Sequence, residues 1–86
     1  MRIISQDGRT DIPYENFVFG ITKDNSIVAI RDTIARSSEI AHGVVATYST
    51  EEKAKKAMEM LRKDYKKCIK CHYLMTFQFP AEKELE

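Results

Sequence analysis

The chain has 86 residues, of which 43% are hydrophobic and 31% charged, with a formal net charge of +1 at pH 7. This size predicts a single compact domain with a thin core, because so short a chain buries only about 60–65% of the surface that its unfolded form exposes. The near balance of charge argues against general nucleic-acid binding. A thin core gains from covering a second apolar surface, so we expect a homo-oligomer, either a dimer or a larger assembly.

The opening residues MRIIS lack the basic and apolar pattern of a secretory signal, and no run approaches the roughly 20 apolar residues that span a bilayer. We therefore expect a cytoplasmic protein without membrane contact. Its two cysteines are expected to stay reduced in that compartment.

Most of the chain outside the centre predicts strands joined by turns. Asp7-Gly8 is a strong turn dipeptide and predicts an opening hairpin. Pro13 cannot donate a ladder hydrogen bond, so its strand is expected at a sheet edge or bulged at that point. Gly20 is a candidate for a second bulge. The expected strands are residues 2–6, residues 10–21 with the interruption at Pro13, residues 26–31, residues 44–48 and residues 72–79.

Residues 49–67 have the one clear helical period in the chain. Ser49 and Glu52 have the spacing of a capping box and predict where the helix begins. One stripe is apolar and predicts the buried face, while charged residues cover the rest of the circumference. The stripe consists of Ala54, Ala57, Met58, Leu61 and Tyr65. Residues 68–71 are expected to form a connector to the last strand.

This order of elements predicts an α+β fold, with a mainly antiparallel β-sheet of about five strands and one long amphipathic helix packed on one face. The acidic tail, residues 81–86, is expected to fray. Apolar residues are divided over both faces of the expected sheet, so the face away from the helix is a candidate oligomer surface. These residues are Phe17, Phe19, Val28, Ile30, Phe77 and Phe79.

Cys68, Cys71 and His72 form a CxxCH sequence, the attachment pattern of c-type haem. Haem attachment needs export, which the opening residues do not predict. A zinc site would need His42 as a fourth ligand. We expect neither cofactor nor metal, with the cysteines acting as small apolar residues. Cys71 and His72 would point to opposite faces of a strand, and no other catalytic motif is present, so we do not expect an enzyme.

Two groups of basic residues are candidates for anion binding. The first lies at the end of the expected helix, where cations also stabilise the helix dipole, and consists of Arg62, Lys63, Lys66, Lys67 and Lys70. The second lies in a long loop, residues 32–42, and at its entry. Arginine guanidinium groups with hydroxyl groups and an imidazole can hold a phosphate. The predicted ligand-binding residues are Arg31, Arg36, Ser37, Ser38 and His42.

The segments MRIISQDGRTDIPYE, YSTEEKAKKAMEMLRKDY and FQFP together resemble small uncharacterised prophage and mobile-element proteins of Gram-positive bacteria. The resemblance covers both ends of the chain and supplies no site residues. It implies a non-enzymatic accessory protein that acts in the host cytoplasm. The first hypothesis is that it counteracts host defence by sequestering a small phosphorylated, nucleotide-type immune signal. The alternative is a protein-interaction module that docks on a host defence protein complex, through a sheet edge or an apolar face, and inhibits it.

Overall fold

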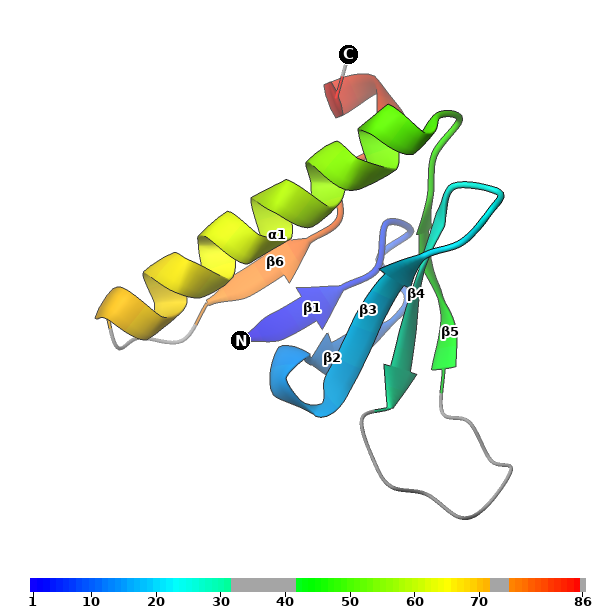
Figure 1. Cartoon of the computed structure of the whole chain (residues 1–86). Coiled ribbons are helices and arrows are strands. Elements are labelled where there is room, and N and C mark those ends of the chain that lie inside the picture. Colours follow the sequence, from blue (N-terminus) through cyan, green and yellow to red (C-terminus); the bar gives the residue numbers. More distant parts are fainter. Residues whose placement is uncertain (32–41, 72–74, 86) are drawn as a thin grey trace.

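The computed structural model describes residues 1–31, 42–71 and 75–85 (Figure 1). These residues form one long helix and two three-stranded sheets, so the predicted α+β class is confirmed and the single sheet of about five strands is wrong. The first sheet, sheet A, has the strand order β2-β1-β6, and the second, sheet B, has the order β3-β4-β5. The strands are β1 (Arg2–Ile4), β2 (Asp11–Pro13), β3 (Phe17–Ile21), β4 (Ser26–Arg31), β5 (His42–Thr47) and β6 (Thr76–Gln78).

Pro13 explains why the expected strand over residues 10–21 is divided. β2 ends at Pro13, and the 3-10 helix η1 (Tyr14–Asn16) follows at once and directs the chain into β3 of the other sheet. Pro13 donates no ladder hydrogen bond, and β2 is indeed an edge strand. The predicted interruption at Pro13 is therefore correct, but it separates two sheets rather than bulging one strand.

Sheet A combines an antiparallel and a parallel strand pair. β1 and β2 form the predicted hairpin, whose turn contains Gly8 with a φ of 76°. β6 pairs parallel to β1. This pair joins the two ends of the chain in one sheet. Sheet B and α1 lie between β1 and β6 in the sequence.

Sheet B is antiparallel throughout. Gly20 pairs with Val28 in regular register, so the bulge proposed at Gly20 is wrong. The irregularity lies instead between β4 and β5, at Ile27 and Val28. On β4, Ile27 and Ala29 are buried while Ile30 is exposed, so one face of sheet B is core and the other keeps apolar side chains in solvent.

The long helix α1 (Glu51–Cys71) begins and ends later than expected. Its first turn is capped by Thr50, whose Oγ1 accepts a hydrogen bond from the Lys53 N–H at 3.2 Å, so the Ser49 capping box is wrong by one residue. The expected connector over residues 68–71 is helical instead. Cys68 packs against the core and prolongs the apolar stripe by three residues beyond Tyr65, and no proline or glycine stops the helix there.

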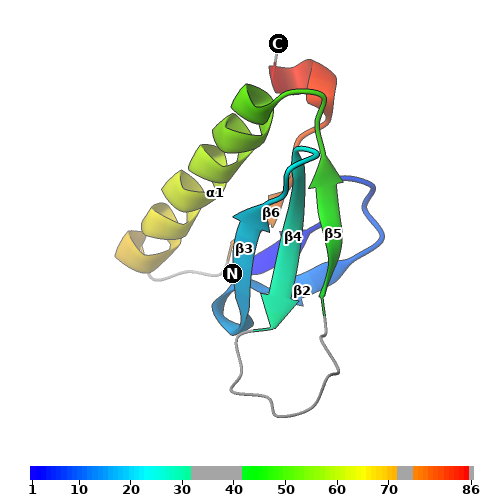
Figure 2. The ribbon, with the colours of Figure 1, turned by 45° about the vertical axis from the view of Figure 1, so that its right-hand side comes forward.

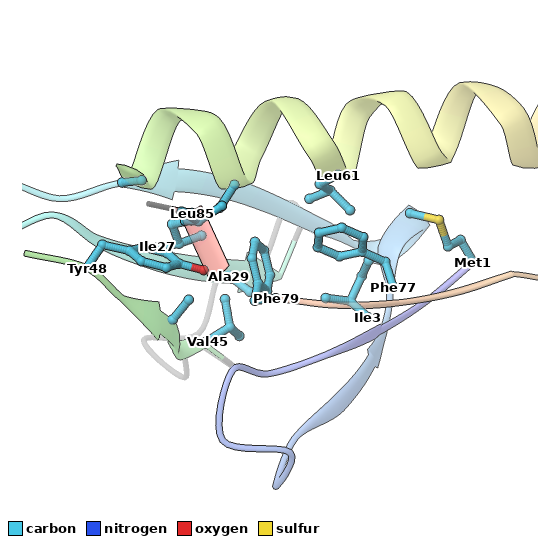
Figure 3. Packing of buried hydrophobic residues seen from close by; sticks show 13 residues of the cluster. Met1, Ile3, Ile27, Ala29, Val45, Tyr48, Leu61, Phe77, Phe79 and Leu85 are labelled. Atoms are coloured by element: carbon cyan, nitrogen blue, oxygen red, sulfur yellow. The ribbon is translucent and has the colours of Figure 1, made fainter. Parts of the chain in front are cut away.

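The core lies between α1 and the two sheets (Figure 3). Leu61 points from α1 toward Phe77, and the ring of Phe77 meets that of Phe79 edge-on at 5.2 Å. Ile3 from sheet A and Ile27 from sheet B are fully buried. The predicted stripe of α1 is confirmed, since Ala54, Ala57 and Leu61 are buried while Met58 and Tyr65 are partly buried.

The expectation that the acidic tail frays is corrected by its packing. The tail forms the 3-10 helix η2 (Glu82–Leu85), and the side chain of Leu85 is buried. The Ser49 N–H donates a hydrogen bond to Glu82 Oε1 at 2.6 Å, and Lys53 Nζ lies 3.5 Å from Glu82 Oε2. The hydrogen bond from Ser49 holds the pKa of Glu82 below its usual value. The buried Leu85 side chain and the contacts of Glu82 with Ser49 and Lys53 thus hold the tail against the start of α1.

Candidate functional site

The predicted phosphate-binding residues fall only partly in the described structure. Arg31 is the exposed last residue of β4, and His42 is the first residue of β5 and not a loop residue as predicted. Both lie at one end of sheet B, where His42 pairs with Ile30. Arg36, Ser37 and Ser38 lie outside the described residues, so the structure does not test whether this set converges.

The CxxCH residues show no metal site in the described part of the chain. Cys68 is half-buried and Cys71 belongs to the last turn of α1, while His72 lies outside the described residues. Residues 1–31, 42–71 and 75–85 contain no group of three or more histidine, cysteine or acidic residues able to hold a metal ion. None of the helices in these ranges is long and apolar enough to cross a membrane.

A small cleft of about 320 Å³ lies between residues of the two sheets. Ile12 of sheet A and Phe17, Ala29 and Val44 of sheet B line it. Arg31 follows Ala29 by two residues on β4, so it lies on the same face of that strand. The cleft is lined by Ala29 near the end of β4 and by Gly43 and Val44 near the start of β5.

A larger hollow surface lies between β3 and α1. It consists of two hollows, of about 400 and 580 Å³, which share Phe19, Met58 and Arg62 and so form one β3–α1 groove. Figure 2 shows β3 as the strand of sheet B on the side of α1, with β5 on the far side. All five residues of β3 line the groove, as do Tyr14, Glu15, Lys55, Glu59, Leu61 and Tyr65.

Consecutive residues of a strand alternate between its two faces. Because all five residues of β3 line the groove, the groove runs along the edge of β3 and not along one face alone. The hydrogen-bond register defines this edge. The Thr22 N–H donates to the Ser26 carbonyl at 2.8 Å, and the bonded pairs then recur every second residue, at Gly20 with Val28 and at Val18 with Ile30. The backbone groups of Phe17, Phe19 and Ile21 therefore point away from β4.

Part of this outward backbone is left without a partner. The Phe17 N–H donates to the Tyr14 carbonyl in η1. Within residues 1–31, 42–71 and 75–85, the N–H groups of Phe19 and Ile21 have no hydrogen-bond acceptor, and the three outward carbonyls of β3 have no donor. Such a row of unpaired donors and acceptors is a template for another strand.

The other sheet edges carry features that protect them. β2 has only three residues and ends in Pro13, and β6 is equally short. The outer edge of β5 is occupied by Gln6, whose N–H donates to the Val45 carbonyl at 2.7 Å and whose Oε1 accepts from the Thr47 N–H at 3.0 Å. β3 has five residues and contains neither proline nor a charged residue, so its edge is the open one among the described strands.

The groove is apolar at its floor and cationic at its helical wall. Tyr14 stacks on Phe19 with ring centroids 5.6 Å apart, and Tyr65 lies 4.2 Å from Tyr14. Arg62 is exposed at the wall and makes no hydrogen bond or ion pair to any described residue. The carboxylate of Glu15 is already engaged, because the Met1 ammonium donates to it at 3.0 Å and keeps the pKa of Glu15 below its usual value.

Comparisons with protein-family models, curated proteins and solved structures found no match for this chain. The groove must therefore be interpreted from its own chemistry. The sequence predicts Phe19 in a sheet and Arg62 at the basic end of the helix, but no sequence pattern brings the two residues together. The signal that could have paired them is Pro13, which frees β3 from the first hairpin and leaves it beside the helix.

Proposed function

We propose that this protein is a non-enzymatic protein-interaction module that binds an extended segment of a partner along the edge of β3, in the β3–α1 groove. The observation that carries the proposal is the contrast between edges. β2, β5 and β6 are shortened, terminated or capped, whereas β3 presents unpaired backbone groups beside an apolar groove.

Strand addition suits this geometry because backbone hydrogen bonds supply affinity and side-chain pockets supply specificity. An added strand would receive hydrogen bonds from Phe19 and Ile21 and would donate to the outward carbonyls. Its side chains would alternate between the groove, with Phe19 and Met58, and the outer face, beside Val18. Val18 is 53% exposed, so a partner side chain at that position would cover apolar surface now in contact with water.

The resemblance to prophage proteins gives this proposal a biological direction. The partner would be a protein of the bacterial host, and binding would inhibit a host defence complex by occupying a segment that the complex needs. The sequestration of a nucleotide-type signal stays a separate prediction, because three of its five predicted contacts lie outside the described residues.

Amide exchange on the labelled protein tests the proposed edge. A displayed library of random twelve-residue peptides is selected on the folded chain, and the enriched peptides are added while amide exchange is followed by NMR. We expect the Phe19 and Ile21 amides to exchange fast in the free protein and to become protected on peptide binding. The Val18 and Gly20 amides face β4 and serve as internal controls that are protected throughout.

The matched variants Ile21→Pro and Ile21→Val sharpen this test. The proline removes the outward N–H, whereas valine keeps it with a similar half-buried side chain. Peptide binding should be lost in the first variant and retained in the second. If no peptide is enriched, or if bound peptides leave the Phe19 and Ile21 amides unprotected, the proposed function is wrong, and the wild-type exchange data decide this even if Ile21→Pro does not fold.

A further inference from the structure

We infer that the segment bound at β3 is acidic, with a carboxylate that meets Arg62 and with apolar residues on both sides of it. This inference rests on the proposed function and adds the chemistry of the partner. Its starting point is the position of Arg62, which lines both hollows together with Phe19 and so lies across from the middle of β3.

The charge on the groove wall favours an anionic partner. Three charged residues of α1 line the groove, namely Lys55, Glu59 and Arg62. Lys55 is weakly paired, with its Nζ 3.9 Å from Glu51 Oε2. Glu59 has no ion pair to a described residue, and the three wall residues together carry a formal charge of +1. Glu15, which lines the groove beside Tyr14, is paired with the Met1 ammonium at 3.0 Å.

The register of strand addition fixes which partner residue carries the carboxylate. In a strand paired with β3, the residue opposite Phe19 shares its face, and that face is directed toward α1, because Phe19 and Met58 line the same hollows. A side chain at this position reaches the groove wall where Arg62 lies. The planar guanidinium can then bind a carboxylate through two parallel hydrogen bonds, which an amide or an ammonium group cannot reproduce.

The two neighbouring partner residues point to the outer face of sheet B. One lies opposite Val18, and the other lies opposite Gly20, where an added Cβ would meet no atom within 4 Å. Both positions therefore suit apolar side chains, and the second has room for a large one. The recognised pattern is Asp or Glu between two apolar residues, of which the one opposite Gly20 is bulky.

The test uses the twelve-residue display library on the wild-type chain and on the variants Arg62→Glu and Lys63→Glu. Lys63 follows Arg62 on the same helix and is exposed, but it does not line the groove, so it controls for net charge. Wild type and Lys63→Glu should enrich peptides with an acidic residue at one fixed position between apolar residues. Arg62→Glu should lose this preference and select Arg or Lys at that position.

The most enriched wild-type peptide then gives the magnitude. Changing its fixed acidic residue to the matching amide should weaken binding at least tenfold to the wild-type chain and less than threefold to Arg62→Gln. Peptides that protect the Phe19 amide without any acidic preference would overturn this inference and leave the proposed function standing. An acidic preference that persists in Arg62→Glu would also overturn it. A library from which nothing binds the β3 edge would contradict both.

Discussion

Replacing Leu61 by alanine tests whether the buried stripe of α1 has been placed correctly. The Leu61 side chain is 1% exposed and packs over Phe77 (Figure 3). The substitution removes about three methylene equivalents, each worth roughly 0.8 kcal/mol of transfer free energy. The cavity that remains adds to this, so we expect a loss of about 3 kcal/mol in the free energy of unfolding.

A loss of this size is large for a chain of 86 residues, whose total stability is expected at roughly 4–13 kcal/mol. Urea denaturation followed by circular dichroism should show the midpoint falling by about 2–3 M, and the melting temperature should fall by about 12–24 °C. The matched control is Ile69→Ala on the same helix, because Ile69 is 55% exposed and its truncation should cost less than about 0.5 kcal/mol. Equal losses for the two variants would refute the assigned rotation of α1.

Single substitutions also test the anchored tail, the space at Gly20, the Glu82 contacts and the predicted phosphate-binding residues. Leu85→Ala should destabilise the chain by about 2 kcal/mol in the same urea assay, because the tail is anchored; an unchanged midpoint would mean that the tail frays. Gly20→Val should raise stability by about 0.5–1 kcal/mol, since an added Cβ meets no atom within 4 Å and valine favours strands. A lower midpoint would place Gly20 in a strained or crowded site. The stabilisation from the Glu82 contacts should be fully present above the ordinary glutamate pKa and should be lost as the pH falls through the lowered pKa of the folded state. Glu82→Gln removes these contacts and should therefore flatten the acid limb of the plot of stability against pH. If the chain binds cyclic nucleotides, they should raise its melting temperature in a thermal-shift scan. Arg31→Ala and Arg36→Ala should each lower the affinity for the nucleotide about tenfold or more, and unchanged affinity in both variants would exclude the loop as the site.

The expected homo-oligomer is tested separately by sedimentation at micromolar concentration. The outer face of sheet B carries Val18, Ile30 and Val44, all of them exposed, and covering them would favour association. We expect a mass above 10.0 kDa for the particle. A monomer across the dilution range would show that this face is left open or reserved for a partner.

Local patterns in the sequence predicted the individual elements well, because each depends on neighbouring residues. Period 3.6 identified the buried face of α1, and Asp7-Gly8 identified the first hairpin. The beginning of α1 was off by one residue because Ser49 and Thr50 are both good caps, and the Ser49 N–H is instead used by the tail. Sequence spacing alone does not decide between two adjacent hydroxyl residues when a distant segment competes for one of them.

Relations between distant segments were not predictable in the same way. The pairing of β6 with β1 joins residues more than 70 positions apart, and no local pattern states its direction. The burial of Leu85 depends on the start of α1, so a short, charged segment with one leucine looked like a frayed end. The β3–α1 groove also depends on distant segments. It forms because η1 directs the chain from β2 into β3 of the other sheet, beside α1.

An open strand edge is a hazard, since it can pair with another copy of the same chain and begin aggregation. The position of α1 limits this hazard. Figure 2 shows the helix alongside sheet B on the β3 side, so whatever pairs with β3 must enter the groove between them. A single extended segment meets that condition more easily than the edge of a second folded sheet, which brings its own helix with it. The same wall that hinders sheet-to-sheet pairing also carries Arg62, so protection of the β3 edge from pairing with another copy and selection of an acidic partner depend on one arrangement of α1 against β3.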